Sequence, residues 1–277
     1  MRLRRAAVAG TWYPATAERL NGALATHLHN AGAQGAAAPC ANSELIALVA
    51  PHAGLMYSGP VAAHAYRLLE GRTFDTIIVV GPSHYVTFEG ASIWRAGAFE
   101  TPLGNLRIDE DMASAIIDGC PIVSDLPAAH AREHSIEMQL PFLASLAPTA
   151  RIVPLVMGHQ TRDTAFALAD CLAAVASQKN ALLIASSDLS HFFEAAIAAS
   201  LDHQVAEHVE TLDADGLMAR LERRPEHACG GGPMVSVLRA ATALGGATSR
   251  VLQYADSGDV SGDKSSVVGY LAAAIWR

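Results

Sequence analysis

The fold is decided by two stretches of sequence, Leu45-Ile-Ala-Leu-Val-Ala-Pro51-His52-Ala-Gly54 and Ile77-Ile-Val-Val-Gly81-Pro82-Ser83-His84. Each is a short aliphatic run closed by proline and glycine, which is typical of a buried parallel strand. The residue after the carboxyl end of such a strand points into the crevice where open α/β sheets bind ligands. Neighbouring strand ends would bring His52 and His84 together, although they lie 32 positions apart (84 minus 52). A single histidine of this kind usually has a structural role, and the repetition favours a metal site.

Strands and helices alternate along the rest of the chain. Aliphatic runs predict strands at 44–50, 75–81, 91–98, 151–157, 181–187, 249–256 and 265–275. Helical spacing of apolar residues predicts helices at 15–30, 60–70, 109–118, 135–146, 162–177, 193–210, 214–223 and 232–244, and small residues predict a loop at 31–43. Such alternation implies a mainly parallel or mixed central sheet with helices on both faces. We expect one three-layer α/β domain over residues 1–277.

The composition restricts the class of protein. Hydrophobic residues make up 51% of the 277 residues, which is enough for a large core. The formal net charge is −8, and the absence of a long basic run argues against a nucleic-acid partner. No apolar stretch reaches the roughly 18 residues of a membrane span, and the opening residues are too short for a signal peptide. We therefore expect a cytoplasmic protein with no membrane partner.

The four cysteines, Cys40, Cys120, Cys171 and Cys229, lie far apart and form no CxxC pair. The simplest interpretation is a reducing compartment and no disulfide framework, with the first three as inert thiols. Cys229 is different because Gly230-Gly231-Gly232-Pro233 and then a predicted helix follow it. The helix dipole would stabilise a thiolate there, which would be a good metal ligand. An inert thiol beside a flexible turn is the alternative.

Two further motifs carry polar side chains. A third strand ends in Ser186-Ser187-Asp188-Leu189-Ser190-His191, which invites comparison with hydrolase triads, although no G-x-S-x-G elbow is present. We expect Asp188 to cap the following helix or to orient a neighbour rather than to catalyse. In Glu133-His134-Ser135-Ile136-Glu137, His134 and Glu137 would share one helix face and could bind metal or cap the helix.

The ordered motifs are Pro51-His52-Ala53-Gly54, Gly81-Pro82-Ser83-His84, Glu133-His-Ser-Ile-Glu-Met138, Ser186-Ser-Asp188 with His191, and Cys229-Gly230. In this order they resemble the Memo family, whose bacterial members are called AmmeMemoRadiSam system protein B. The opening Gly10-Thr11-Trp12-Tyr13-Pro14 is also similar to that family. The resemblance spans nearly the whole chain as a single Memo-like domain. The family in turn resembles the class III (LigB-like) extradiol dioxygenases, which implies their fold and their use of non-haem Fe(II).

The resemblance implies that His52, His84 and Cys229 are metal ligands. The dioxygenases use two histidines and a carboxylate, so the cysteine at position 229 is a departure. Sulfur is softer than carboxylate and shifts the preference toward copper or zinc, although Fe(II) is the ion that the resemblance favours. A thiolate is also oxidisable, so ring cleavage is not simply inherited.

The resemblance also implies roles for residues around the ion. His191 matches a catalytic histidine of the dioxygenases, and His134 corresponds to a second acid–base histidine. Trp12 matches an aromatic residue at the pocket mouth of Memo proteins. Together with Tyr57 it would stack on an aromatic substrate, and Asp188 would also lie in the pocket.

Three functions fit these residues. The first is a metal-dependent, dioxygenase-like redox enzyme that acts on a small substrate. The second is a non-catalytic module that binds a peptide or metabolite in the same cleft, and the third is a zinc hydrolase with His191 as general base. The bacterial family name further implies a functional link to a radical-SAM enzyme and a companion protein of the same system.

Overall fold

A nine-stranded sheet runs through the centre of the protein in the order β10-β12-β2-β9-β3-β8-β4-β7, with β11 also paired to β12. The computed structural model describes residues 2–33 and 43–277. Four parallel strands form the middle of the sheet: β2 (Leu45–Ala50), β9 (Ala181–Ser186), β3 (Thr76–Pro82) and β8 (Arg151–Met157). Their aliphatic side chains are buried because helices cover both faces of the sheet. The strands predicted for these four stretches are confirmed.

The margins of the sheet contain antiparallel pairs, so the sheet is mixed. β12 (Val267–Trp276) is antiparallel to β2, to β11 (Thr248–Asp256) and to β10 (His191–Phe193). On the other margin, β4 (Ala91–Ile93) is antiparallel to β8 and parallel to β7 (Val123–Ser124). Since the four central strands are parallel, their carboxyl ends share one edge of the sheet.

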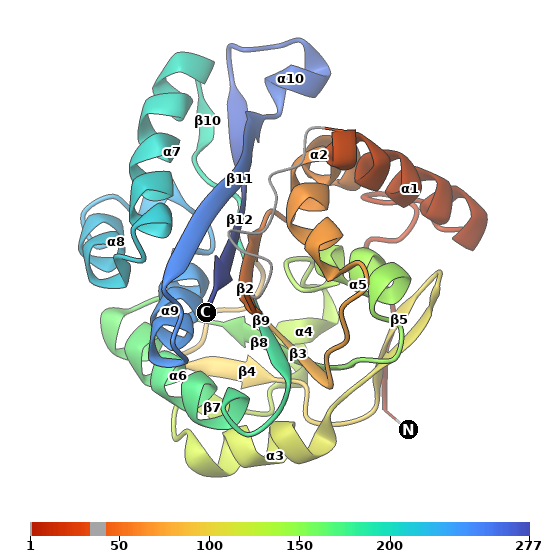
Figure 1. The fold of residues 1–277 in the computed structure, drawn as a ribbon, viewed down its shortest axis with the longest axis vertical. Helices are drawn as coiled ribbons and strands as arrows, with labels where there is room; N and C mark the ends of the chain where they lie inside the picture. The colour runs from red at the N-terminus through yellow and green to blue at the C-terminus, as the bar shows by residue number, and fades with distance from the viewer. Residues whose placement is uncertain (1, 34–42) are drawn as a thin grey trace.

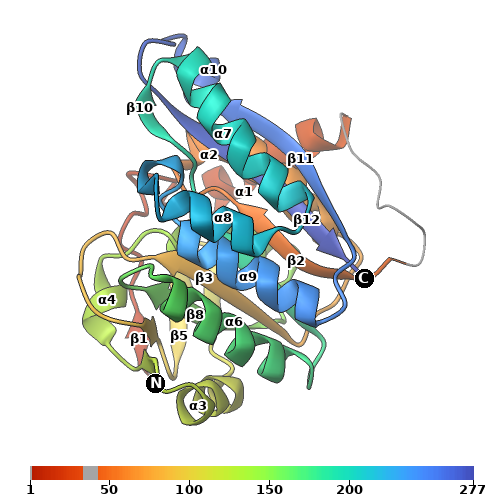
Figure 2. The same cartoon turned by 90° about the vertical axis from the view of Figure 1, so that its left-hand side faces the viewer.

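Helices form a layer on each face of the sheet (Figure 1). One layer, on the right of that view, contains α1 (Ala17–Ala33), α2 (Leu55–Tyr66) and α5 (Leu140–Leu146). The other contains α6 (Arg162–Ala176), α7 (Ala195–Glu210), α8 (Ala214–Leu221) and α9 (Gly231–Ala243) (Figure 2). The expected three-layer α/β architecture is therefore confirmed. No helix among the described residues combines the length and the apolar character needed to cross a bilayer.

A small second sheet replaces part of the strand predicted at 91–98. It consists of β1 (Leu3–Arg4), β5 (Ala98–Thr101) and β6 (Gly104–Arg107). The predicted strand is split because the chain turns at Gly97, where φ is +96° and an added Cβ would lie 1.8 Å from the Arg2 carbonyl oxygen. Only glycine permits both that backbone conformation and that approach. α3 (Glu110–Gly119) and α4 (Pro127–Ala131) follow this sheet.

Several predicted boundaries differ from the structure. The helix predicted at 60–70 begins at Leu55 and continues as the 3-10 helix η1 (Arg67–Leu69), because Pro60 lies inside α2 rather than at its start. The helix predicted at 135–146 is divided into the 3-10 helix η2 (Glu137–Gln139) and α5. β10, η3 (Pro225–His227) and α10 (Gly258–Ser261) were not predicted. The loop predicted at 31–43 begins later, because α1 continues to Ala33, and its residues 34–42 lie outside the described residues.

The expectation of four unpaired cysteines is wrong. Cys120, at the C-terminal end of α3, forms a disulfide with Cys171 on α6, and their Cα atoms lie 5.9 Å apart. The two residues are 51 positions apart in sequence, and only the packing of α3 against α6 brings them together. Cys229 is free, and Cys40 lies outside the described residues.

Candidate metal centre

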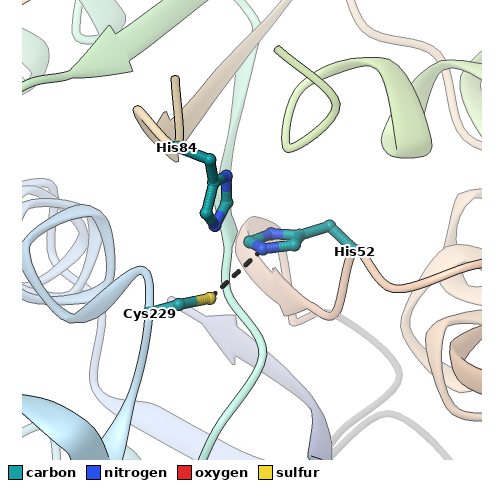
Figure 3. A group of neighbouring side chains, drawn as sticks. All are labelled: His52, His84 and Cys229. Atoms are coloured by element: carbon teal, nitrogen blue, oxygen red, sulfur yellow. Dashed lines mark hydrogen bonds between the residues drawn. The ribbon is translucent and has the colours of Figure 1, made fainter. Parts of the chain in front are cut away.

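Two histidines and a cysteine from three parts of the chain converge at the carboxyl ends of the parallel strands. His52 follows β2, His84 follows β3, and Cys229 precedes α9, and the three side chains point toward one another (Figure 3). Their ligand atoms all lie within 4.8 Å of one another. The Sγ atom of Cys229 is 3.2 Å from Nε2 of His52. Two imidazoles and one sulfur at this spacing can surround a single metal ion.

Polar groups at the end of β9 hold His52. The buried Asp188 carboxylate accepts hydrogen bonds from the backbone N–H groups of His52 (2.7 Å) and Ala53 (3.2 Å). Nδ1 of His52 lies 2.9 Å from Oγ of Ser186. Asp188 therefore orients the chain after β2, which is one of its two expected roles. The other role, capping the following helix, is wrong because Glu194 occupies the N-cap of α7.

The Glu133 carboxylate holds His84. It accepts hydrogen bonds from Nδ1 of His84 (2.9 Å) and from the backbone N–H of the same residue (2.6 Å). It also accepts the backbone N–H groups of His134 and Ser135. Glu133 is only 2% exposed, and these donors compensate the cost of burying its charge. Sequence analysis missed this residue, and the available signal was an acid directly before the histidine of a recognised motif.

A glycine lets the loop that carries Cys229 approach the end of β9. An added Cβ at Gly230 would lie 2.4 Å from the carbonyl oxygen of Ser186, so a side chain there would push the loop away. The backbone N–H of Cys229 donates to the Asp188 carbonyl oxygen (3.3 Å). From the other side, Nε2 of Gln160 donates to the Cys229 carbonyl oxygen (2.7 Å). The sulfur is thereby fixed beside His52.

Burial controls the protonation of His52 and Cys229. Burial, together with the neighbouring His84, lowers the pKa of His52 to about 3, so its imidazole is neutral at ordinary pH. Burial and the charge of Asp188 raise the pKa of the Cys229 thiol well above its usual range. Without a metal ion, burial and the neighbouring acid therefore favour the protonated thiol over the thiolate that the start of α9 was expected to stabilise. Metal coordination would displace that thiol proton.

His134 is packed between Trp12 and His84. Its ring centroid lies 4.3 Å from that of Trp12 and 4.4 Å from that of His84, with the two imidazoles stacked at 22°. Burial and the nearby His52 lower the pKa of His134 to about 3. The Tyr85 hydroxyl lies 3.4 Å from Nδ1 of His134. The expected pocket-mouth aromatic is thus in direct contact with the expected acid–base histidine.

The remaining expected residues lie outside the metal-ligand group. His191 begins β10, and its Nδ1 is 2.8 Å from the Leu189 carbonyl oxygen, which engages one ring nitrogen and leaves the other available. The adjacent Phe192 is 77% exposed and has a φ of +66°, a strained conformation for a residue with a Cβ. Tyr57 is half-buried in the first turn of α2, beside Gly54.

Glu137 does not pair with His134 as expected. Its carboxylate accepts a hydrogen bond from the Tyr13 hydroxyl (2.6 Å) and pairs with the buried Arg4 guanidinium. Residues 133–136 form no helix, and η2 begins only at Glu137. The two side chains therefore serve different parts of the protein.

A second group, His84, Glu133 and His134, also brings its ligand atoms within 4.8 Å of one another. However, the Glu133 carboxylate already accepts four N–H groups, and Nδ1 of His84 carries one of them. An ion there would have to replace these hydrogen bonds. The group of His52, His84 and Cys229 is the better metal site.

A cavity of about 410 Å³ adjoins Cys229. It lies between the N-terminal ends of α6 and α9 and the helix α8, and its apolar walls include Met218, Leu221 and Pro225. A volume of this size can hold a small molecule. A ligand in this cavity would lie next to the residue that supplies the sulfur.

Comparison with known proteins agrees with the sequence motifs. The profile of the Memo-like protein family matches residues 4–274. A MEMO1 family protein of Methanopyrus kandleri is 38% identical over 99% of both chains, and one of Sulfolobus acidocaldarius is 40% identical over 98% of both chains. A MEMO1 family protein of Methanosarcina mazei is 38% identical over 99% of this chain and 100% of its own.

Among solved structures, an uncharacterized protein from Escherichia coli K12 has a similar fold. The TM-score is 0.57 at 16% sequence identity, and the match covers 82% of this chain and 99% of that chain. At this identity the likeness concerns the fold alone. The profile match and the relatives that align from end to end show that this chain belongs to the Memo-like protein family.

Proposed function

We propose that this protein is a mononuclear non-haem metal protein in which His52, His84 and Cys229 hold the ion. The observation that carries the proposal is the convergence of these three ligand atoms within 4.8 Å at the strand ends. The donor set fits a divalent transition metal because it combines two neutral imidazoles with a sulfur. Fe(II) is the ion that the Memo resemblance favours, and the sulfur also suits copper or zinc.

We further propose that the protein is a dioxygenase-like redox enzyme. Bound iron would supply redox chemistry toward dioxygen. His191, with one ring nitrogen engaged by the Leu189 carbonyl, has the other available to take up or release a proton. The resemblance implies the same role for His134, although its pKa of about 3 keeps the imidazole neutral and disfavours proton uptake.

The surroundings support a small substrate. The cavity of about 410 Å³ beside Cys229 has room for one. Trp12 does not line this cavity, but its ring contacts that of His134 at a tilted angle, and there it would cover the flat face of an aromatic molecule. Tyr57 would extend this aromatic surface from the first turn of α2. We also propose that the protein acts in the cytoplasm and that, as the resemblance implies, it has a functional link to a radical-SAM enzyme and a companion protein of the same system.

Two observations favour other functions. Two histidines and one cysteine are also a zinc donor set, which supports a zinc hydrolase with His191 as general base. A second hollow, a groove of about 520 Å³, is lined by Trp12, Leu55 and Met56, and the last of these is 62% exposed. This groove supports a non-catalytic module that binds a peptide or metabolite.

The metal content of protein purified without affinity tag or chelator tests the proposal. We expect one ion per chain by elemental analysis, loss of that ion in His52→Ala, and its retention in His29→Ala, a control on the exposed side of α1. Fe(II)-loaded protein should then consume oxygen with a member of a panel of catechols.

The alternatives give different results. Tight binding of zinc, with no gain in activity when iron is added, would support the zinc hydrolase. A chain that binds no metal but retains a peptide or metabolite through Trp12 would support the binding module. Full metal occupancy in His52→Ala would overturn the assignment of the ligands.

A further inference from the structure

One short segment, Glu133–Gln139, contacts the hydrogen-bonding networks of both candidate metal-ligand histidines. We propose that Glu133 and Gln139 are positioning residues that fix His84 and His52 in one tautomer, with the proton on Nδ1 and the lone pair on Nε2. The proposal rests on the proposed metal site, because it explains how two nitrogen lone pairs are presented to one ion. Neither Glu133 nor Gln139 needs to touch the ion.

The tautomer of His84 follows from its contact with Glu133. Three backbone N–H groups, those of His84, His134 and Ser135, donate to the carboxylate, and Nδ1 of His84 faces it as well. A carboxylate that accepts three N–H groups is held in its ionised form and can only accept hydrogen bonds. Nδ1 of His84, at 2.9 Å from Oε1, must therefore carry its proton. The lone pair of the neutral ring is then on Nε2.

The tautomer of His52 depends on the orientation of the Gln139 amide. Nε2 of Gln139 lies 3.0 Å from the Pro51 carbonyl oxygen, which can only accept, so the amide nitrogen must be on that side. Its oxygen then accepts the Tyr66 hydroxyl at 2.7 Å. The same amide nitrogen donates to Oγ of Ser186 at 2.7 Å. One acceptor position of the serine is therefore used.

The single proton of the Ser186 hydroxyl is also assigned. Its Oγ lies 2.7 Å from the Ser135 carbonyl oxygen, which has no proton to give, so Ser186 must be the donor. With its proton used there, Ser186 can only accept from Nδ1 of His52, which lies 2.9 Å away. Nδ1 of His52 is therefore protonated and Nε2 is unprotonated. This Nε2 is the atom 3.2 Å from the sulfur of Cys229.

The segment can reach both histidines because it passes close to β3. An added Cβ at Gly81 would lie 2.6 Å from Oγ of Ser135, so a larger residue would displace the segment. The same Oγ donates to the Pro82 carbonyl oxygen at 2.8 Å. The backbone of the segment is thus fixed against the strand end that precedes His84. Glu133 and Gln139 can orient the two imidazole rings only if their own backbone is held in place, and these contacts hold it.

The first test uses the wild-type protein stripped of metal. Two-bond ¹H–¹⁵N correlation spectra distinguish the two neutral histidine tautomers, with signals assigned through His52→Gln and His84→Gln. We expect both rings to be protonated at Nδ1. A spectrum with His84 protonated at Nε2 would overturn the proposal. This measurement needs no bound metal, so it tests the proposal even if the proposed metal function fails.

The second test compares Glu133→Gln with Glu44→Gln, the same change at an acid that precedes β2, at the opposite end of that strand from His52. Glutamine at 133 places a donor against the N–H groups of His84, so we expect a mixed His84 tautomer. Outer partners of this type typically change metal affinity about 10–100-fold. We therefore expect Co(II) affinity, followed by the sulfur-to-cobalt absorbance of Cys229, to fall within that range. Glu44→Gln should leave both the tautomer and the affinity unchanged.

The outcomes separate the two proposals. Equal Co(II) affinity in Glu133→Gln and wild type would overturn the positioning role and leave the metal site intact. A wild type that binds no cobalt, zinc or iron would overturn the metal site, while the tautomer spectrum would still decide the positioning role. If Glu133→Gln does not fold, the wild-type spectrum alone decides.

Discussion

Two buried carboxylates four positions apart, Glu133 and Glu137, serve two different regions of the protein. Glu133 is 2% exposed and accepts hydrogen bonds around the candidate metal centre, with His84 as its main partner. Glu137 is fully buried and serves the N-terminal arm, which we define as residues 4–13. It accepts hydrogen bonds from this arm, including one from the Tyr13 hydroxyl, and pairs with Arg4. The first carboxylate supports a candidate site, and the second attaches the arm that carries the pocket-mouth aromatic.

The difference shows how local backbone geometry assigns roles. In an α-helix, residues four apart lie on one face and would meet the same neighbours. Here residues 133–134 have no regular structure and residues 135–136 form a turn, and the 3-10 turn η2 begins only at Glu137. Glu133 and Glu137 therefore point to different regions. The two carboxylates are similarly buried, so their roles differ through their hydrogen-bond partners. Mutations of each acid and of its partners can test this difference.

The largest effect should come from Glu137→Ala. This change leaves Arg4 buried without its partner and removes the acceptor for Ala7, Val8 and Tyr13. Breaking a buried ion pair typically costs about 3–5 kcal/mol of unfolding free energy. We expect a loss in that range by urea denaturation.

The exposed pair Arg224–Glu226 provides the control for that experiment. Exposed ion pairs contribute at most about 1 kcal/mol, so Glu226→Ala should lose no more than that. Equal losses in the two variants would show that Glu137 does not anchor the arm.

Tyr13→Phe should have the next largest effect. It deletes the hydroxyl that donates to Glu137 at 2.6 Å but retains the buried ring. Hydrogen bonds to charged groups contribute about 1.5–3 kcal/mol, and we expect a loss of that size in the urea transition. A change within experimental error would mean that the backbone donors of the arm suffice for Glu137.

The arm region should also respond to acid. Burial lowers the pKa of His130 to about 3, and the carbonyl of this residue accepts a hydrogen bond from Arg4. The unfolded chain protonates the same histidine near pH 6.5. Stability from the neutral ring is therefore complete above that pH and is lost as pH falls toward 3, by about 1.4 kcal/mol per unit.

His130→Gln checks this pH dependence, because glutamine retains a donor for the Ser92 carbonyl that His130 contacts. Its unfolding free energy should fall less steeply than that of wild type between pH 6 and pH 4. Parallel curves for the two proteins would assign the acid sensitivity to other groups.

The smallest effect should come from Ser186→Ala on the metal-centre side. The hydroxyl that accepts from His52 is neutral, unlike the Glu133 carboxylate that accepts from His84. A neutral hydrogen bond is worth about 0.5–1.5 kcal/mol, which corresponds to a loss of roughly tenfold or less in metal affinity. A competitive zinc titration measures it. If Ser186→Ala lost more metal affinity than Glu133→Gln, then Ser186 rather than Glu133 would be the more important of the two residues that hold the histidines.

Sequence patterns predicted the central strands and predicted that their carboxyl ends lie side by side at one edge of the sheet. His52 and His84 could be brought together in advance because parallel strands place their carboxyl ends at one edge. The match of Cys229 to the family motif supplied the third residue, which no spacing rule connects to the other two. The structure brings all three within 4.8 Å of one another, while their binding of an ion stays a prediction.

The supporting residues could not be predicted in the same way. Glu133, Ser186 and Gln139 act through hydrogen bonds between distant segments, and such contacts leave no periodic signal in a sequence. The division of the helix predicted at 135–146 was missed for a different reason. Pro141 lies in the first turn of α5 and has no N–H to donate to a preceding turn, so the α-helix begins only after η2.

The link between Cys120 and Cys171 has a practical consequence for every experiment on Cys229. A thiol reagent such as dithiothreitol protects the sulfur of Cys229 from oxidation, but it also opens the crosslink between α3 and α6. A native disulfide typically contributes about 2–4 kcal/mol to stability. Preparations made with and without reductant are therefore covalently different molecules, and their unfolding curves and metal titrations should be compared only within one redox state.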